Sequence, residues 1–339
     1  MSKRAPVAIA TAATFVLAGC ASPLPEQAPA PADTVNDIRR SHSELPAGSV
    51  LEAAGSRDDG VPDENIKPSL RPDGKPPEER VPDIVKRGRL IVGVDPSLNL
   101  LSFREGATGE LRGFEIDLAH EIARDIFGDA DKVDFKFLNA SGPADAIETD
   151  QVDLLLRNAS ITAKRQKDMA FSIPYLRADT RLLTPVDSRI TEPRETAGGT
   201  VCATEDSTPV SFARRLTPMA NILITRSWSD CLMAVQQGQA DAVLTDDTIL
   251  SGMVAQDPYT HLVGEPLNTS YYGAVLPKPT KDNDTSGLIR QVNATIERTR
   301  NDGTLDRIYD KWFGSYLPNR SLPAPEYYPE STREGGDAR

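Results

Sequence analysis

The chain has 339 residues, of which 39% are hydrophobic, 26% charged and 6% aromatic; this is the composition of a soluble globular protein with material for two domains, not that of a membrane channel. Asp and Glu total 50 against 38 Lys and Arg, a formal net charge of -12, so we expect no nucleic acid among its partners. The 27 prolines are about 8% of the chain, above the usual ~5%, and predict unstructured segments beside the folded part.

The first 20 residues have the features of an export signal. Lys3 and Arg4 precede a mostly apolar run that ends in Leu-Ala-Gly-Cys at residues 17–20. The run is too short for a transmembrane helix and resembles a bacterial lipobox, which predicts a lipoprotein signal peptide over residues 1–19 and a lipidated Cys20. We therefore expect a lipid-anchored protein on the extracytoplasmic face of the cell membrane. The alternative is a secreted protein with a chance cysteine at its cleavage site.

The next segment, residues 20–81, lacks Phe, Tyr and Trp and contains prolines throughout. Such a stretch cannot bury a core, so we expect a disordered tether with an r.m.s. reach of about 40 Å. Pro, Ser, Glu and Gly return after Leu317, which predicts a disordered tail over residues 318–339.

Between the tether and the tail, strand-like and helix-like patterns alternate. Apolar runs predict strands at residues 90–94, 133–138, 152–156, 200–203, 221–225 and 241–244. Helical spacing of apolar residues predicts helices at residues 114–127, 143–148, 210–216 and 229–237. This alternation indicates an α/β fold with parallel sheets and right-handed crossovers, and the core is long enough for two lobes.

The chain has three cysteines. With Cys20 assigned to lipid, Cys202 and Cys231 remain in a chain that we expect to fold in an oxidising compartment, so we predict a disulfide between them. Two unrelated buried thiols are the alternative. We expect no metal or cofactor, because the three histidines are scattered and no Cys/His cluster has ligand spacing.

Two polar clusters follow predicted strands, where open α/β sheets bind ligands. Residues 157–165 combine hydroxyl, amide and guanidinium groups, and residues 245–248 offer a carboxylate at a predicted helix start. A zwitterionic amino acid needs such a pair, because a bidentate arginine matches its α-carboxylate and a fixed carboxylate matches its ammonium group. Taken alone, Arg165 has the alternative of a solvated helix charge, and Asp246 that of a helix cap.

Several short motifs occur in a fixed order along the core. They are R-L-I-V-G-V (89–94), G-F-E-I-D-L-A (113–119), S-I-T (160–162) with Arg165, F-S and P-Y (171–175), D-A-V (241–243) with Asp246, and K-W-F-G (311–314). In this order, over about residues 82–317, the chain resembles the family 3 solute-binding proteins of ABC transporters for polar amino acids. Within the family it is most similar to lipid-anchored glutamate- and glutamine-binding proteins with a cysteine pair in the second lobe.

The resemblance implies a two-lobed periplasmic-binding-protein-like fold, each lobe a mostly parallel sheet flanked by helices, joined by two hinge segments. Lobe 1 would comprise residues 82–176 and 272–317, and lobe 2 residues 177–271. The chain would cross between the lobes near residues 175–179 and 267–271, so that closure around a ligand would be a hinge motion. We expect a monomer.

The resemblance also implies the ligand-binding residues by motif position. Arg165 would bind the α-carboxylate, helped by Ser160, Thr208 and the backbone at Asn158. Asp246 would bind the ammonium group from the other lobe, so the ligand would stabilise the closed state.

Two further residues bear on the ligand's side chain. Asp95 stands where relatives often select that side chain, and a carboxylate there favours an amide or a cation. Arg157 favours a ligand carboxylate if it faces the cleft, and is an ordinary surface charge if it points outward. We therefore expect glutamate, glutamine, aspartate or asparagine as the ligand, delivered to the permease subunits of an ABC transporter.

Two other function classes remain open. A sensor lipoprotein would bind the amino acid by the same chemistry and signal to a membrane partner. An enzyme, as among cyclohexadienyl dehydratase relatives with this fold, would need a pocket carboxylic acid that delivers a proton. The sequence has no visible nucleophile–base pair, metal-ligand spacing or cofactor loop, so we do not expect an enzyme.

Overall fold

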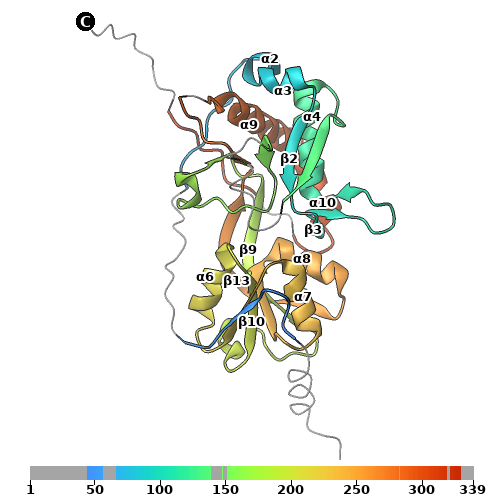
Figure 1. Cartoon of the computed structure of the whole chain (residues 1–339), viewed down its shortest axis with the longest axis vertical. Helices are drawn as coiled ribbons and strands as arrows, with labels where there is room; N and C mark the ends of the chain where they lie inside the picture. Colours follow the sequence, from blue (N-terminus) through green and yellow to red (C-terminus); the bar gives the residue numbers. More distant parts are fainter. Residues whose placement is uncertain are drawn as a thin grey trace, which may run out of the picture.

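The computed structural model describes residues 44–55, 66–138, 147, 151–281, 283–318 and 321–329. They form two α/β lobes connected by two long strands (Figure 1). The expected signal peptide and Cys20 lie outside the described residues, as does the expected helix at residues 143–148 apart from Ile147. No helix within these described ranges has the length and apolar character that a membrane span requires.

Lobe 1 contains a five-stranded sheet in the order β6-β2-β7-β14-β8. Its strands are β2 (Leu90–Val94), β6 (Val133–Phe137), β7 (Leu154–Leu155), β8 (Ala170–Phe171) and β14 (Val275–Leu276). β2 pairs in parallel with β6 and β7, whereas β14 pairs antiparallel with β7 and β8. The continuous apolar run of β2 is buried on both faces, as expected for a central parallel strand.

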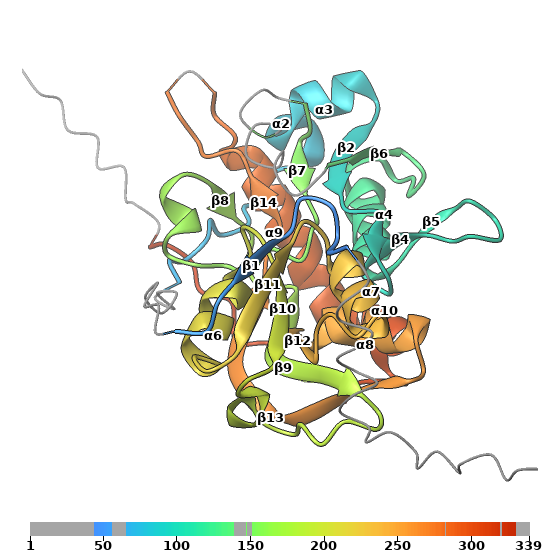
Figure 2. The same cartoon turned by 60° about the horizontal axis from the view of Figure 1, so that its bottom comes forward.

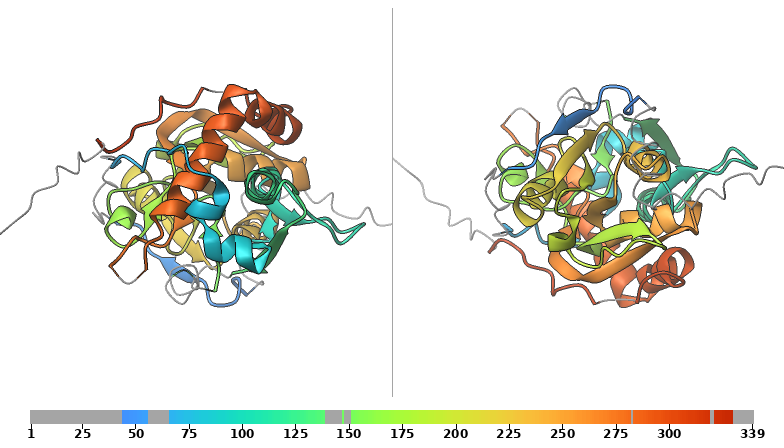
Figure 3. Two further views of the ribbon diagram at one scale, coloured as in Figure 1. Left: turned by 90° about the horizontal axis from the view of Figure 1, so that it is seen from above. Right: turned by 90° about the horizontal axis from the view of Figure 1, so that it is seen from below.

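Among the described residues of lobe 1, five helices have defined bounds: α2 (Pro77–Arg80), α3 (Pro82–Arg87), α4 (Phe114–Phe127), α9 (Ser286–Asn301) and α10 (Thr304–Phe313). The bounds of α4 are those expected from its apolar spacing, and the helix ends at Gly128, whose positive φ of 70° suits a residue without a Cβ atom. Viewed from above, α9 runs across the top of the lobe and packs against α2, α4 and α10 (Figure 3).

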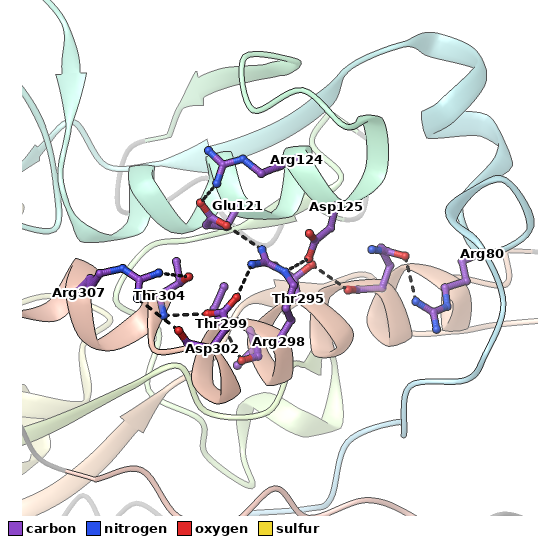
Figure 4. A network of polar contacts seen from close by, with 12 residues as sticks. Arg80, Glu121, Arg124, Asp125, Thr295, Arg298, Thr299, Asp302, Thr304 and Arg307 are labelled. Carbon is purple, nitrogen blue, oxygen red and sulfur yellow. Dashed lines mark hydrogen bonds and ion pairs between the residues drawn. The ribbon is translucent and has the colours of Figure 1, made fainter.

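A network of ion pairs fixes α9 against α4 (Figure 4). Arg298 of α9 lies 2.7 Å from Glu121, 2.9 Å from Asp125 and 3.0 Å from Asp302. Burial alone would lower the pKa of Arg298, but its hydrogen bonds to Asp125 and Glu121 outweigh burial and raise it above the ordinary value. The network therefore keeps its charges paired in the folded protein, on the side of α4 that faces α9.

Lobe 2 contains a six-stranded sheet in the order β1-β11-β10-β12-β9-β13 (Figure 2). Its strands are β1 (Val50–Glu52), β9 (Leu176–Pro185), β10 (Thr200–Thr204), β11 (Asn221–Thr225), β12 (Ala242–Asp246) and β13 (Thr260–Tyr272). β11, β10 and β12 are parallel, as expected, whereas β1, β9 and β13 pair antiparallel with their neighbours. The antiparallel strands lie outside the parallel centre of the sheet.

Three helices flank this sheet: α6 (Thr208–Leu216), α7 (Trp228–Gln236) and α8 (Asp247–Gln256). Two single turns of 3₁₀ helix also occur, η1 (Arg165–Lys167) in lobe 1 and η2 (Pro193–Thr196) in lobe 2. The expected disulfide is confirmed: Cys202 of β10 is bonded to Cys231 of α7, with 5.6 Å between their Cα atoms, and both residues are fully buried.

Replacing Cys202 and Cys231 together by alanine is expected to lower the free energy of unfolding by about 3–4 kcal/mol, because the bond closes a 29-residue separation whose loop entropy then returns to the unfolded chain. Urea unfolding of the wild type with and without a reductant, and of the double variant, measures this loss. The double variant should match the reduced wild type and should not respond to the reductant. An unchanged unfolding midpoint in both would contradict the expectation.

β9 and β13 form the connection between the lobes (Figure 1). They pair along most of their length, from Leu176 opposite Tyr272 to Pro185 opposite Thr260, with a register shift between Val263 and Asn268. At the lobe 1 end, the backbone N–H of Ile161 donates to the carbonyl of Tyr271 (2.9 Å). The expected crossing segments, residues 175–179 and 267–271, lie at this end of the strand pair.

The structure corrects the expectation of a tether that is disordered throughout residues 20–81. Residues 44–55 lie along lobe 2, where β1 pairs with β11 and Glu52 forms a bidentate ion pair with Arg214 (2.8 and 3.0 Å). Residues 66–81 pack on lobe 1, where the Ser69 hydroxyl donates to the carbonyl of Phe171 (2.7 Å). These segments are ordered because the two lobes supply the strand edge and apolar surface that the segments lack themselves.

Part of the expected disordered tail is ordered for the same reason. Ser69 and Tyr327 form a parallel β-bridge, and the Tyr327 hydroxyl donates to Glu297 of α9 (2.7 Å). The guanidinium of Arg71 stacks over the Tyr327 ring at 4.7 Å from its centroid. The described part of the tail therefore extends lobe 1 beyond residue 317 and covers the segment at residues 66–71.

Candidate functional site

A cavity of about 300 Å³ lies between the two lobes, at the lower end of the size range of small-molecule sites. Its lobe 1 wall consists of Asp95, Leu155, Arg157, Asn158, Ala159, Arg165, Met169, Phe171 and Val275. Its lobe 2 wall consists of Thr204, Glu205, Asp206, Ser207, Arg226, Ser227 and Trp228. Most of the polar residues directly follow the carboxyl ends of β2, β7, β10 and β11, the position where open α/β sheets bind ligands.

Arg165 joins the two walls of the cavity. It begins the turn η1, its Nη1 donates to the carbonyl of Ser160 in its own lobe (3.0 Å), and its Nη2 donates to the carbonyl of Asp206 in lobe 2 (3.3 Å). Burial lowers the pKa of Arg165, while the charge of Asp246 opposes this shift. An arginine nevertheless remains protonated, so the cavity contains a fixed positive charge.

The loop that precedes Arg165 has a constrained backbone. Asn158 is in the left-handed region with φ of 45°, and its backbone N–H donates to Oε1 of Glu115 (2.6 Å). Ser160 is buried and forms a β-bridge with Tyr272 at the end of β13, so its hydroxyl is not part of the cavity wall. The loop is thus attached to the hinge strands as well as to the cavity.

Asp246 is not among the residues that line the cavity. The residue is 3% exposed, and its carboxylate accepts hydrogen bonds from the hydroxyls of Tyr272 (2.7 Å) and Thr180 (3.3 Å). Burial raises the pKa of Asp246, although both hydrogen bonds and the nearby charge of Arg165 oppose the shift. Extending the parallel register of β10 and β12 places Asp246 beside Glu205, which does line the cavity.

Arg157 lines the cavity. The sequence alone did not determine whether its side chain faces the cleft or points outward. Its Nη2 lies 3.3 Å from Oδ2 of Asp95, and both side chains are mostly buried, with 16% and 20% exposed. Oδ1 of Asp95 accepts from the backbone N–H and the hydroxyl of Ser97 (3.0 and 2.6 Å). The buried Nε of Arg157 has no hydrogen-bond partner among the described residues. Asp95 and Arg157, the two residues expected to act on the ligand's side chain, therefore form an ion pair with each other.

The lobe 2 wall differs in detail from the sequence-based expectation. Thr208 is the first residue of α6 and does not line the cavity, whereas its neighbour Ser207 does. Asp206, Arg226 and Trp228 were not expected at the site. All three follow strands of the parallel centre, so the strand-end argument that selected residues 157–165 could also have selected them.

The lobes also touch beside the cavity. Leu98 of β3 (Ser97–Leu98) is 3% exposed and lies with Trp228, Leu232 and Ile249 of lobe 2. Gly252 of α8 lies so close to lobe 1 that an added Cβ atom would be 2.3 Å from the carbonyl oxygen of Asn99. β3 belongs to a small antiparallel sheet with β4 (Ser102–Arg104) and β5 (Leu111–Arg112), whose hairpin projects from lobe 1 (Figure 2). The lobes therefore contact each other beside the cavity as well as through the hinge strands.

Two lobes, two connecting strands and a polar cavity between them characterise a protein that binds a small solute by closure. Residues 90–315 match the bacterial extracellular solute-binding proteins, family 3. The chain belongs to this family. The match contains the whole cavity wall, whereas the ordered segments at residues 44–55, 66–81 and 321–329 lie outside it. They are additions to the family 3 domain.

The chain is similar to individual members of this family and to one of their solved structures. It is 31% identical over 225 residues to the ABC transporter glutamine-binding protein GlnH of Bacillus subtilis, covering 66% of this chain and 81% of the relative. It is 34% identical over 200 residues to the glutamine-binding protein of Geobacillus stearothermophilus, covering 59% and 76%. Among solved structures, an ancestral arginine-binding protein bound to glutamine superimposes with a TM-score of 0.60 at 29% identity, covering 67% of this chain and 99% of the other.

Proposed function

We propose that this family 3 protein captures a polar amino acid by closure of its two lobes and delivers it to an ABC permease. Glutamine is the first candidate ligand, followed by glutamate, asparagine and aspartate. The observation that carries the proposal is the position of Arg165, whose guanidinium lies in the cavity and bonds to both lobes. In the proposed complex the α-carboxylate of the ligand binds this guanidinium and the carboxylate of Asp246 balances the ammonium group.

The pair of Asp95 and Arg157 supports an amide as the ligand's side chain. An amide has a donor and an acceptor, so it can donate to the Asp95 carboxylate and accept from the Arg157 guanidinium at the same time. A side-chain carboxylate would meet the like charge of Asp95, and a cationic side chain that of Arg157. The glutamine-binding relatives and the glutamine-bound neighbour support the same choice.

Calorimetric titration with the standard amino acids tests the proposal. We expect glutamine to bind most tightly and to raise the unfolding temperature, because a ligand that binds only the folded protein stabilises it. Tight binding of lysine or arginine alone would contradict the assignment of the side-chain site. Binding of no amino acid would contradict the proposed function as a whole.

Replacing Asp95 by asparagine is expected to weaken glutamine binding by about 1 kcal/mol, the difference between a hydrogen bond to an ionised acceptor and one to a neutral acceptor. Glutamate binding should weaken less or improve, because the like charge disappears. The measurement is the ratio of the glutamine and glutamate dissociation constants. Asp134→Asn is the matched control, because Asp134 pairs with Arg89 (2.7 Å) outside the cavity and is 56% exposed. An unchanged ratio in Asp95→Asn would remove Asp95 from the side-chain site.

We further propose that Cys20 carries the lipid anchor. The sequence Leu-Ala-Gly-Cys after a short apolar run supports this, as does a family whose members are extracellular. Cells fed labelled palmitate should incorporate the label into the full chain and not into the Cys20→Ser variant. Equal labelling of both chains would place the lipid elsewhere, and absence of label in the wild type would favour a secreted protein.

A further inference from the structure

Glu115 lies between the cavity and the hinge, although it contacts no ligand position itself. It is in the first turn of α4 and is fully buried. Its Oε1 accepts two hydrogen bonds, one from the backbone N–H of Asn158 (2.6 Å) and one from the hydroxyl of Tyr175 (2.5 Å). Its Oε2 is buried and has no partner among the described residues. Oε1 therefore accepts two hydrogen bonds, whereas Oε2 can hold a proton.

One of the two donors lies in the cavity wall and the other at the start of the hinge strands. Asn158 lines the cavity and has a left-handed backbone conformation, which asparagine tolerates better than most residues. Tyr175 immediately precedes the hinge strand β9, and its backbone N–H donates to the carbonyl of Tyr272 at the end of β13 (2.9 Å). Through Glu115, the ligand loop and both hinge strands share one hydrogen-bonded centre.

The charge state of this centre depends on its surroundings. Burial raises the pKa of Glu115 to about 7; the hydrogen bonds from Tyr175 and Asn158 and the charge of Arg157 oppose that shift, while the charge of Asp95 adds to it. The charge of Glu115 in turn contributes to the raised pKa of Tyr272. The charged and titratable groups that act on Glu115 are thus Tyr175 from the hinge and the Asp95–Arg157 pair from the cavity.

We propose that Glu115 is a positioning residue that holds Asn158 and Tyr175 in the closed arrangement and takes up one proton from solvent when the cleft closes on its ligand. The proton would bind Oε2, so that both hydrogen bonds to Oε1 remain. The inference rests on the proposed amino-acid binding, because the ligand's α-carboxylate brings negative charge close to the Asn158 loop.

The sign of the pH dependence follows from linkage. Glu115 and both of its hydrogen-bond donors belong to lobe 1, so the change that acts on it is the arrival of the ligand's α-carboxylate, whose negative charge raises the pKa of Glu115 in the ligand-bound state above that in the free protein. The proton's contribution to affinity is complete below the pKa of Glu115 in the free protein, which burial raises to about 7, and is lost as the pH rises through the higher pKa of the ligand-bound state. Amino-acid affinity should therefore fall between pH 6 and 8.5.

Calorimetry of the full chain at pH 7, in two buffers with different ionisation enthalpies, counts the protons taken up on glutamine binding. We expect net uptake by the wild type and an affinity at least about threefold weaker at pH 8.5 than at pH 6, since a fully linked group changes affinity up to tenfold per pH unit. Glu115→Gln keeps an acceptor for both donors and imitates the protonated acid. It should retain the wild-type affinity of pH 6 throughout this range and take up no proton.

Two further variants separate positioning from a general structural role. Glu121→Gln is the matched control, because Glu121 lies on the same helix, is 7% exposed and bonds to Arg124 and Arg298 away from the cavity; it should keep the wild-type profile. Tyr175→Phe removes a hydrogen bond that lowers the pKa of Glu115, so the fall in affinity should move to higher pH. If Glu115→Gln does not fold, the pH profile of Tyr175→Phe and the number of protons taken up by the wild type still test the inference.

The inference is overturned if wild-type binding takes up no proton and is constant from pH 6 to 8.5, or if Glu115→Gln keeps the pH dependence of the wild type. Either result leaves the proposed function intact, because glutamine still binds. A wild type that binds no amino acid at any pH overturns both, so the two failures are distinguishable.

Discussion

Replacing Arg165 by alanine should weaken amino-acid binding by about 2–5 kcal/mol, or roughly 30- to 5,000-fold, because the ligand's α-carboxylate would lose its charged partner inside a closed cleft. Most of the loss should appear as faster dissociation. Arg165→Lys should be intermediate, since lysine keeps the charge but not the planar fork that binds both oxygens. Calorimetry or stopped-flow fluorescence with glutamine measures these effects.

The control for this prediction is Arg124→Ala. Arg124 lies on the outer side of α4, pairs with Glu121 and is 53% exposed, so its removal should leave glutamine affinity unchanged. The unfolding temperature of Arg165→Ala without ligand should remain close to that of the wild type. Near-normal affinity in Arg165→Ala would show that the α-carboxylate binds elsewhere in the protein.

Asp246→Asn is expected to produce a loss of similar size, about 2–5 kcal/mol, because it removes the charge that balances the ligand's ammonium group while keeping one of the two oxygens that accept from Tyr272 and Thr180. Since burial raises the pKa of Asp246, wild-type affinity should also fall in acid as this carboxylate takes up a proton. That acid limb should be absent in Asp246→Asn. Affinities measured by calorimetry from pH 4.5 to 7 test both expectations.

Asp206→Asn is the control for the Asp246→Asn experiment. Asp206 also offers a carboxylate, it lines the cavity, and its φ of 55° is one that asparagine readily adopts. A small effect in Asp206→Asn and a large one in Asp246→Asn support Asp246 as the ammonium partner. The reverse result would transfer that role to Asp206.

The two pH effects act in opposite directions on binding. Protonation of Asp246 weakens the proposed ammonium site, whereas protonation of Glu115 favours the proposed closed arrangement. The wild type should therefore bind most tightly between the two transitions. Glu115→Gln should remove only the loss of affinity at high pH, and Asp246→Asn only the loss at low pH.

The parts of the fold predicted from the sequence depend on local patterns. The apolar run of β2 and the helical spacing of α4 predict these elements without knowledge of the rest of the fold. A strand buried on both faces needs a continuous apolar run, and a helix buried on one side needs apolar residues at helical spacing. α9 carries the same local signal, because Leu288, Val292 and Ile296 recur at helical spacing and are buried.

The ordered parts of the tether could not have been predicted in the same way. β1 has three residues, and Val50 and Leu51 remain 57% and 50% exposed, so nothing local requires a strand there. The segment is ordered by the free edge of β11 and by the ion pair between Glu52 and Arg214, partners separated by 162 residues. Low aromatic content correctly excludes an independent core but does not exclude docking on an existing one.

The candidate site was likewise predictable only in part from the sequence. The motif positions selected Arg165, Asn158 and Asp95, and these three line one cavity wall together with Arg157, whose orientation the sequence left open. The backbone N–H of Asn158, expected to help bind the α-carboxylate, donates to Glu115 instead. The role of Glu115 depends on hydrogen bonds to residues 43 and 60 positions away, which no spacing in the sequence indicates. Contacts of this kind are fixed only when the two lobes and the hinge strands are assembled.

The most direct test of this account is a crystal structure of the protein with glutamine. We expect the ligand between the two lobes, its α-carboxylate bound by both terminal nitrogens of Arg165 and its amide placed between Asp95 and Arg157. Glutamine density outside this cavity, or an empty closed cavity at saturating glutamine, would contradict the account.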